Sequence, residues 1–220
     1  AKPAEQTPFT ALLLAKILHD AGLPAGVCNV VTGTGAETGA PLTAHPDVDH
    51  ITFTGSVQTG KAVMKAAADE ITRVVLELGG KSPVVVLGDC DREQALSGVL
   101  GAIYENAGQI CSAGSRLVIE KNIHADFVAE LVKRTKSLTL GHGLGNPDVG
   151  PVNSAGHLAK VAGFVDRARA RGADIVTGGA TAADPKTGKG WFYEPTIVDS
   201  VAARDELAQE EIFGPVLTVQ

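Results

Sequence analysis

The sequence has few cysteines and aromatic residues, no excess of basic charge and no long apolar run. Its three cysteines (Cys28, Cys90, Cys111) lie far apart, which excludes a disulfide framework or structural zinc site and favours a reducing compartment, the cytoplasm. The net charge of −6 has no basic stripe, so nucleic-acid and anionic-membrane partners are disfavoured. No segment is apolar over the length of a bilayer, no signal-peptide pattern is present, and none of the six histidines has metal-ligand spacing.

The composition that remains is that of a globular α/β chain. Its 220 residues are 44% hydrophobic and include 26 glycines, enough for one sizeable domain or for parts of two. The chain begins at Ala1 without a methionine and stops at Gln220 within an apolar run. Both ends are therefore expected to be cuts in a longer protein.

Apolar strands and helices alternate in the first part of the chain. A helix is predicted after Thr7-Pro8, and further helices should separate strands at 27–31, 48–53 and 72–78. This alternation predicts βαβ units and a parallel sheet, with ligands beyond the carboxyl ends of its strands. Cys28 lies within the first of these strands and is expected in the core. Residues 1–78 are interpreted as the later portion of a Rossmann-like nucleotide-binding domain.

The glycine pair Gly79-Gly80 interrupts this pattern, and a second domain over 79–220 is predicted to follow it. Asp89 is expected to cap a helix that runs toward Glu105. The remaining predicted elements are strands at 84–87, 116–119, 173–177 and 191–197, a final strand at 216–220, helices at 124–138 and 157–171, and polar loops at 141–151 and 178–190.

Cys111 lies among small residues, where a substrate could approach its thiol closely. A thiolate is a strong nucleophile, but a lone cysteine is more often a small core residue, and on this stretch alone the core interpretation is favoured. Gly55 and Ser56 stand at a predicted helix start, where backbone N–H groups favour a pyrophosphate, although such a turn also occurs without a ligand. Gly33-Thr34-Gly35 misses the dinucleotide-binding glycine spacing by one residue and is expected to line the adenosine side.

Five separated elements occur together in an order and spacing that resemble the NAD(P)-dependent aldehyde dehydrogenase superfamily. The resemblance covers essentially the whole chain and implies an aldehyde dehydrogenase-like α/β fold, truncated at both ends. The elements are Lys2-Pro3-Ala4-Glu5-Gln6-Thr7-Pro8, Phe53-Thr54-Gly55-Ser56, Glu77-Leu78-Gly79-Gly80-Lys81, Gly108-Gln109-Ile110-Cys111 and Glu210-Glu211-Ile212-Phe213-Gly214-Pro215-Val216.

The resemblance implies oxidation of an aldehyde to a carboxylic acid with NAD as hydride acceptor. Cys111 would form a thiohemiacetal and then a thioester, and Glu77 would act as general base for its hydrolysis. An ordinary strand-end carboxylate is the alternative interpretation of Glu77. The oxyanion-hole asparagine of the family has no counterpart here, so the isolated chain is expected to be poorly active and prone to associate.

Cofactor contacts follow from the same resemblance. Lys2 and Glu5 match the adenosine-ribose contacts, and the Glu5 carboxylate favours NAD over NADP because it would repel a 2′-phosphate. Glu211 would hold the nicotinamide ribose, and Phe213 would pack beside the nicotinamide ring. The alternative interpretation of these residues is a solvated acidic run that precedes a core phenylalanine. Gly55, Ser56, Leu78 and Gly79 complete the expected cofactor set, and no metal is expected.

The partners implied are a small-molecule aldehyde and further copies of the parent protein, a homodimer or homotetramer. Ile110 and Ser112 flank the nucleophile and are expected to touch the aldehyde, whose identity the sequence leaves open. Three alternatives remain: a non-catalytic NAD-binding or assembly protein with the same fold, a thiol-dependent esterase, and a CoA-acylating enzyme. The last is disfavoured because such members usually lack a base of the Glu77 type.

Overall fold

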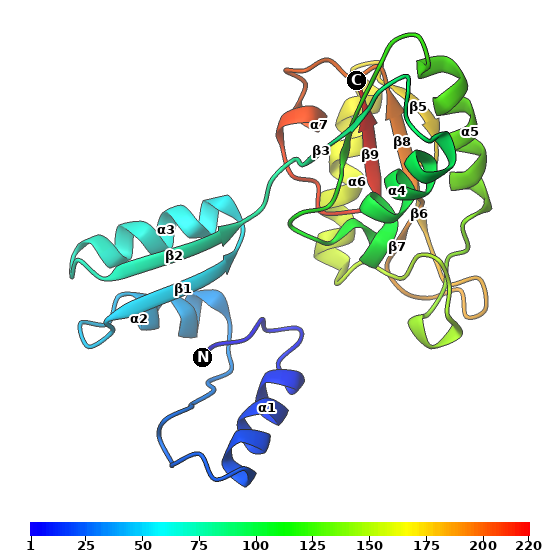
Figure 1. The fold of residues 1–220 in the computed structure, drawn as a ribbon. Coiled ribbons are helices and arrows are strands. Elements are labelled where there is room, and N and C mark those ends of the chain that lie inside the picture. Colours follow the sequence, from blue (N-terminus) through cyan, green and yellow to red (C-terminus); the bar gives the residue numbers. More distant parts are fainter. The chain divides into compact units, whose positions relative to one another are not determined.

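The computed structural model describes residues 1–220 and divides into two compact units, Ala1–Gly79 and Gly80–Gln220 (Figure 1). We call them the N-terminal unit and the C-terminal unit. The division lies one residue beyond Leu78, the last residue of the nucleotide-binding portion expected from the sequence. No helix in the structure has the length and apolar character needed to span a membrane.

The N-terminal unit is built on a pair of parallel strands. These pair in register from His50 opposite Arg73 to Gly55 opposite Leu78, and a small core of Ile51, Val63 and Ala67 lies beside them. Its elements are α1 (Phe9–Asp20), η1 (Gly35–Gly39), α2 (Ala40–Thr43), β1 (His50–Gly55), α3 (Val57–Ala68) and β2 (Arg73–Leu78).

Helix α3 shows how the sequence sets this geometry. Its N-cap is Ser56, whose Oγ accepts a hydrogen bond from the Thr59 N–H at 3.2 Å, as is typical of a serine cap. A Cβ added to Gly60 would lie 2.7 Å from Leu78 Cδ2, so a larger residue here would force the Leu78 side chain at the end of β2 to move. The helix start and the two strand ends therefore form one edge.

The predicted strand at 27–31 is wrong. This segment forms no strand, its valines Val27 and Val31 are 65% and 45% exposed, and Cys28 is exposed rather than in the core. The Val31 N–H instead donates to the Ala1 carbonyl at 3.0 Å. Apolar composition alone does not make a strand where no neighbouring strand takes up its backbone hydrogen bonds.

The C-terminal unit contains a five-stranded sheet in the order β3-β4-β9-β8-β5, in which only β5 is antiparallel to its neighbour. The helices are α4 (Arg92–Tyr104), η2 (Glu105–Gly108), α5 (His124–Ser137), η3 (Gly143–Gly145), α6 (Ala155–Ala170) and α7 (Glu206–Gln209). The strands are β3 (Pro83–Val86), β4 (Arg116–Ile119), β5 (Asp174–Thr177), β6 (Thr181–Ala182), β7 (Phe192–Tyr193), β8 (Thr196–Asp199) and β9 (Val216–Val219).

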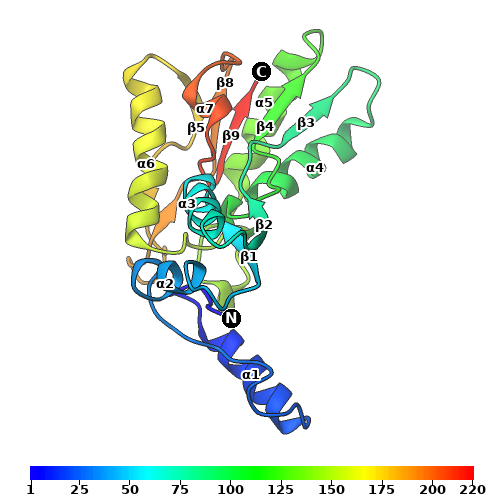
Figure 2. The ribbon, with the colours of Figure 1, turned by 90° about the vertical axis from the view of Figure 1, so that its left-hand side faces the viewer.

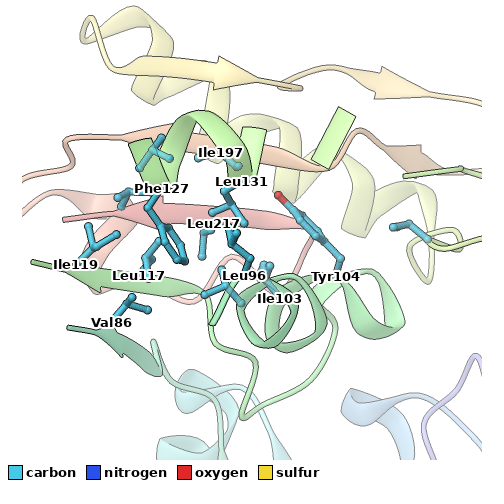
Figure 3. Packing of buried hydrophobic residues seen from close by; sticks show 14 of the residues in the cluster. Val86, Leu96, Ile103, Tyr104, Leu117, Ile119, Phe127, Leu131, Ile197 and Leu217 are labelled. Carbon is cyan, nitrogen blue, oxygen red and sulfur yellow. The ribbon is translucent and has the colours of Figure 1, made fainter. Parts of the chain in front are cut away.

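Helices cover both faces of this sheet (Figure 2). On one face α4 and α5 pack on β3, β4, β8 and β9, and Figure 3 shows Leu96, Phe127, Leu117 and Leu217 meeting in this core. On the other face α6 and α7 pack on β8 and β9. Successive strand residues such as Ile197 and Val198 enter opposite cores, as the two-residue period of a strand requires.

Several predicted boundaries in this unit shift. Helix α4 is capped by Asp91, whose carboxylate accepts from the Gln94 N–H at 3.0 Å, rather than by Asp89. Helix α6 begins at Ala155 because Ser154 caps it. The predicted strand at 191–197 is divided between β7 and β8, and β6 lies inside the predicted loop at 178–190.

Candidate active site

Cys111 is exposed and lies between η2 and β4. The chain reaches it through three consecutive residues in the left-handed region: Asn106 (φ 49°), Ala107 (φ 55°) and Gly108 (φ 71°). Two of these are not glycine, a conformation that costs free energy and persists only where the surroundings hold it. The segment that precedes the thiol is therefore held by its contacts.

Gly108 provides one of these contacts. A Cβ added to it would lie 2.2 Å from the Gly214 carbonyl oxygen and 3.0 Å from that of Ile103. Only glycine fits here, both for its positive φ and for the space. The backbone before Cys111 thus packs directly on the loop that contains Glu211 and Phe213.

The Gln109 side chain provides a second set of contacts. Its Nε2 donates to the carbonyls of Asn106 and Pro151 at 3.0 and 3.3 Å, and its Oε1 accepts from the Asn153 N–H at 2.8 Å. The Asn106 side chain returns a bond to the Gln109 carbonyl at 3.1 Å. Gln109 therefore joins the cysteine segment to the loop that precedes α6.

The residues that follow Cys111 are packed equally closely. The Gly114 N–H donates to the Ala102 carbonyl of α4 at 2.9 Å. A Cβ on Gly114 would lie 2.5 Å from Val84 Cγ2 and 2.8 Å from Ala102 Cβ. Cys111 is thus the exposed tip of a segment fixed at both of its ends.

The loop of Glu211 and Phe213 follows α7 and leads into β9. Phe213 has a positive φ of 61°, and its carbonyl accepts a hydrogen bond from His157 Nε2 of α6 at 2.5 Å. The two rings meet edge to face, with centroids 5.7 Å apart. His157 therefore supports the strained residue of this loop.

Lys81 and Arg116 lie at the amino ends of the neighbouring strands β3 and β4, and Glu211 lies on the loop that leads into β9. Lys81 Nζ, Arg116 Nε and Glu211 Oε1 are each buried without a hydrogen-bond partner. Burial and, to a smaller extent, the Arg116 guanidinium lower the pKa of Lys81 to about 7, against the opposing effect of the Glu211 carboxylate.

Glu77 lies in the N-terminal unit, at the carboxyl end of β2. It pairs in register with Thr54 of β1, and the next pair is Leu78 with Gly55. The structure thus brings the expected residues Gly55, Ser56, Glu77, Leu78 and Gly79 to one edge of the strand pair, where ligands of parallel sheets are expected. Glu77 is an exposed residue.

Lys2 and Glu5 lie together in the N-terminal unit. Lys2 Nζ is 3.8 Å from Glu5 Oε2 and donates to the carbonyls of Pro3 and Gly33 at 2.6 and 3.1 Å. The Lys2 stem also lies beside Gly39, where an added Cβ would be 3.5 Å from Lys2 Cε. The two predicted ribose residues and the glycine-rich turn therefore form one cluster.

Two supporting residues were not predicted from the sequence: Gln109 and His157. Gln109 belongs to the cysteine element, but it acts through hydrogen bonds to Pro151 and Asn153, which are distant in sequence. For His157 the sequence indicates only that it lacks metal-ligand spacing. His157 and Phe213 lie far apart in the sequence, and no sequence pattern indicates that they are in contact.

The profile of the aldehyde dehydrogenase family matches residues 1–220. The chain belongs to this family. This confirms the predicted family and its α/β fold class. Relatives include the betaine aldehyde dehydrogenase of Bacillus subtilis, 47% identical over all of this chain and 45% of the relative, and the chloroplastic betaine aldehyde dehydrogenase of Beta vulgaris, 43% identical over all of this chain and 44% of the relative.

Solved structures agree with this aldehyde dehydrogenase chain along its whole length. A betaine aldehyde dehydrogenase of Staphylococcus aureus in complex with NAD+ superposes with a TM-score of 0.97 at 39% identity, covering 100% of this chain and 45% of that one. A mutant aldehyde dehydrogenase of Bacillus cereus has a TM-score of 0.95 at 41% identity, covering 99% of this chain and 44% of that one. The chain thus spans less than half the length of the relatives that it matches.

Proposed function

We propose that the protein containing this chain oxidises an aldehyde to a carboxylic acid with NAD as hydride acceptor. The observation that carries the proposal is the exposed Cys111 thiol on a strained segment packed against the Glu211–Gly214 loop. Two relatives support the proposal, because both are named betaine aldehyde dehydrogenases. A similar structure that contains NAD+ supports the choice of cofactor.

Cys111 is the proposed nucleophile. Its thiolate adds to the aldehyde carbon, and the carbonyl oxygen becomes the alkoxide of a thiohemiacetal. Loss of hydride from that carbon to NAD leaves a thioester on Cys111. Water then attacks the thioester, the Glu77 carboxylate takes its proton, and the acid and the free thiol are released. The sum is aldehyde, NAD+ and water giving acid, NADH and a proton.

The residues proposed to hold NAD suit its groups. Gly55 and Ser56 stand at the start of α3, where backbone N–H groups favour a pyrophosphate, with Leu78 and Gly79 on the adjacent strand end. Glu5 and Lys2 would contact the adenosine ribose, with NAD favoured over NADP. The buried, unpartnered Oε1 of Glu211 is suited to a nicotinamide-ribose hydroxyl, with Phe213 beside the ring.

The substrate class proposed is an aldehyde that carries an amino or trimethylammonium group. Relatives 43–47% identical are named betaine aldehyde, aminoaldehyde and 4-trimethylaminobutyraldehyde dehydrogenases. Ile110 and Ser112, which flank Cys111, are the residues of this chain proposed to touch the aldehyde. A cytoplasmic homodimer or homotetramer remains the predicted form of the enzyme, and poor activity of residues 1–220 alone remains a prediction.

The deciding experiment uses the full-length protein that contains residues 1–220. NADH formation is measured with betaine aldehyde, 4-trimethylaminobutyraldehyde, an aminoaldehyde and simple aliphatic and aromatic aldehydes. Turnover should be lost in Cys111→Ser and kept in the control Cys90→Ser. NAD binding without turnover would favour a non-catalytic protein. Ester hydrolysis that depends on Cys111 but needs no NAD would favour the esterase, and a requirement for CoA the acylating enzyme.

A further inference from the structure

The start of α6 contacts both the cysteine segment and the loop that contains Glu211 and Phe213. On one side, the Asn153 N–H donates to Gln109 Oε1 of the cysteine segment at 2.8 Å. Farther along the chain, His157 Nε2 lies 2.5 Å from the Phe213 carbonyl oxygen. All of these residues belong to the C-terminal unit. One short stretch of chain therefore joins the candidate nucleophile segment to the candidate nicotinamide loop.

His157 contacts Phe213 twice. A carbonyl oxygen has no proton to give, so His157 Nε2 carries the proton and donates it to the Phe213 carbonyl. The imidazole also meets the Phe213 ring edge to face, with centroids 5.7 Å apart. The backbone of His157 is itself fixed, since its N–H donates at 3.1 Å to Oγ of Ser154, the N-cap of α6. One anchored side chain thus contacts both the backbone and the ring of Phe213.

Phe213 has a backbone conformation that only its surroundings maintain. Its φ of 61° lies in the left-handed region, which costs free energy for a residue with a Cβ. Its two neighbours are buried against α6: Ile212 shares a core with Val161, and a Cβ on Gly214 would lie 2.6 Å from Val161 Cγ2. Phe213 itself is only half-buried. His157 and Val161, four residues apart on α6, therefore hold the backbone on which the Phe213 ring is mounted.

We propose that His157 is a positioning residue that holds the Phe213 ring ready for the nicotinamide of NAD. This rests on the proposed function, in which Phe213 packs beside that ring. Without the hydrogen bond from His157, the strained backbone of Phe213 is free to relax, and the direction of its side chain changes with that rotation. A ring that must be ordered again on binding costs affinity, whereas a ring already in place does not.

The test compares NAD with ADP-ribose, which lacks the nicotinamide, by calorimetry on the full-length protein. His157→Phe keeps an aromatic ring but loses the N–H donor. It should bind NAD about three- to tenfold more weakly than the wild type, the range expected for one lost hydrogen bond, and ADP-ribose equally well. His157→Gln, whose amide can donate in place of Nε2, should restore most of the NAD affinity. The control is His142→Phe, which changes an exposed histidine bonded to the Leu144 N–H of its own loop and should leave both affinities unchanged.

A second background tests whether His157 acts through Phe213. In Phe213→Ala the ring is absent, so adding His157→Phe should weaken NAD binding little further. A full additional loss there would overturn the proposal, as would equal weakening of NAD and ADP-ribose by His157→Phe, which a merely structural role would produce. If His157→Phe does not fold, His157→Asn, whose shorter side chain lacks the reach of Nε2, takes its place. NAD binding unchanged by either variant would overturn the role of His157 alone, whereas absence of NAD binding by the wild type would overturn the proposed function as well.

Discussion

The Cα of Gly108 packs on the carbonyl of Gly214 so closely that a Cβ on Gly108 would lie 2.2 Å from that oxygen. The first glycine stands three residues before the candidate nucleophile Cys111, and the second follows Phe213. The two candidate site segments of the C-terminal unit are therefore in direct backbone contact.

Gly108→Ala should destabilise the C-terminal unit by about 2–4 kcal/mol, since the added Cβ overlaps the Gly214 carbonyl and Ala disfavours a positive φ. Urea unfolding followed by fluorescence of Trp191, the single tryptophan, measures this. The control is Gly98→Ala on α4, where a Cβ meets nothing within 4 Å and should stabilise the helix by about 0.5–1 kcal/mol. Equal stability of the two variants would contradict the packing argument.

Gln109→Leu should loosen the cysteine segment, because it removes the hydrogen bonds to Asn106, Pro151 and Asn153. We expect a loss of about 1–3 kcal/mol of stability and a faster reaction of Cys111 with iodoacetamide. Mass spectrometry of the alkylated peptide measures the rate. Gln109→Glu keeps an oxygen that accepts from the Asn153 N–H but loses the amide N–H groups that donate to Asn106 and Pro151. The rate of Cys111 alkylation in this variant should therefore lie between the rates in the wild type and in Gln109→Leu. An unchanged rate in Gln109→Leu would remove Gln109 from the support of Cys111.

Glu77→Gln should leave the first turnover intact and slow thioester hydrolysis by about 10²–10⁴-fold, the contribution typical of a general base. Rapid mixing of the full-length variant with aldehyde and NAD should then give a burst of NADH near one equivalent per site. Intact mass should show an acyl group on Cys111. The control is Glu70→Gln, another exposed glutamate of the N-terminal unit. Steady NADH formation by Glu77→Gln at the wild-type rate would exclude Glu77 as the base.

Asp148 provides a test of stability against pH. Hydrogen bonds from the Thr139 hydroxyl and N–H, at 2.6 and 2.7 Å, lower the pKa of its carboxyl group. A lowered carboxyl pKa stabilises the fold above the ordinary value of about 4, and this contribution is lost as the pH falls through the lowered value. Asp148→Asn should therefore lower the urea midpoint at pH 6 and change it less near pH 2. The control is Asp89→Asn, which changes an exposed aspartate outside this hydrogen-bonded pair.

The sequence predicts elements well where local pattern and local capping agree. Helix α3 is an example, since the sequence predicts a helix start at Gly55 and Ser56, and Ser56 caps the helix. The predicted strand at 27–31 fails because apolar composition does not supply a neighbouring strand, and Val27 is left exposed. Asp89 and Asp91 are both possible caps for α4, and only the hydrogen bond to the Gln94 N–H identifies Asp91.

In the candidate site, too, local sequence patterns predict some residues and not others. Residues within short motifs, such as Cys111 and Glu77, can be chosen from the sequence because the motif names them. Their supports cannot, because each depends on a contact that the whole fold creates. The His157 ring reaches the Phe213 carbonyl only because α6 lies beside the loop before β9, and Lys81 comes near Arg116 only because β3 pairs with β4. No local sequence pattern predicts these contacts.

The central position of β9 has a consequence for the order of folding. Until residues 216–219 enter between β4 and β8, the sheet exists only as two separate strand pairs. Gly214 reaches Gly108, three residues before Cys111, with that same strand. On the ribosome Cys111 emerges about 100 residues earlier, which at about 5–20 residues per second corresponds to about 5–20 s. For that interval the segment of the candidate nucleophile Cys111 lacks the contact between Gly108 and Gly214 that later holds it.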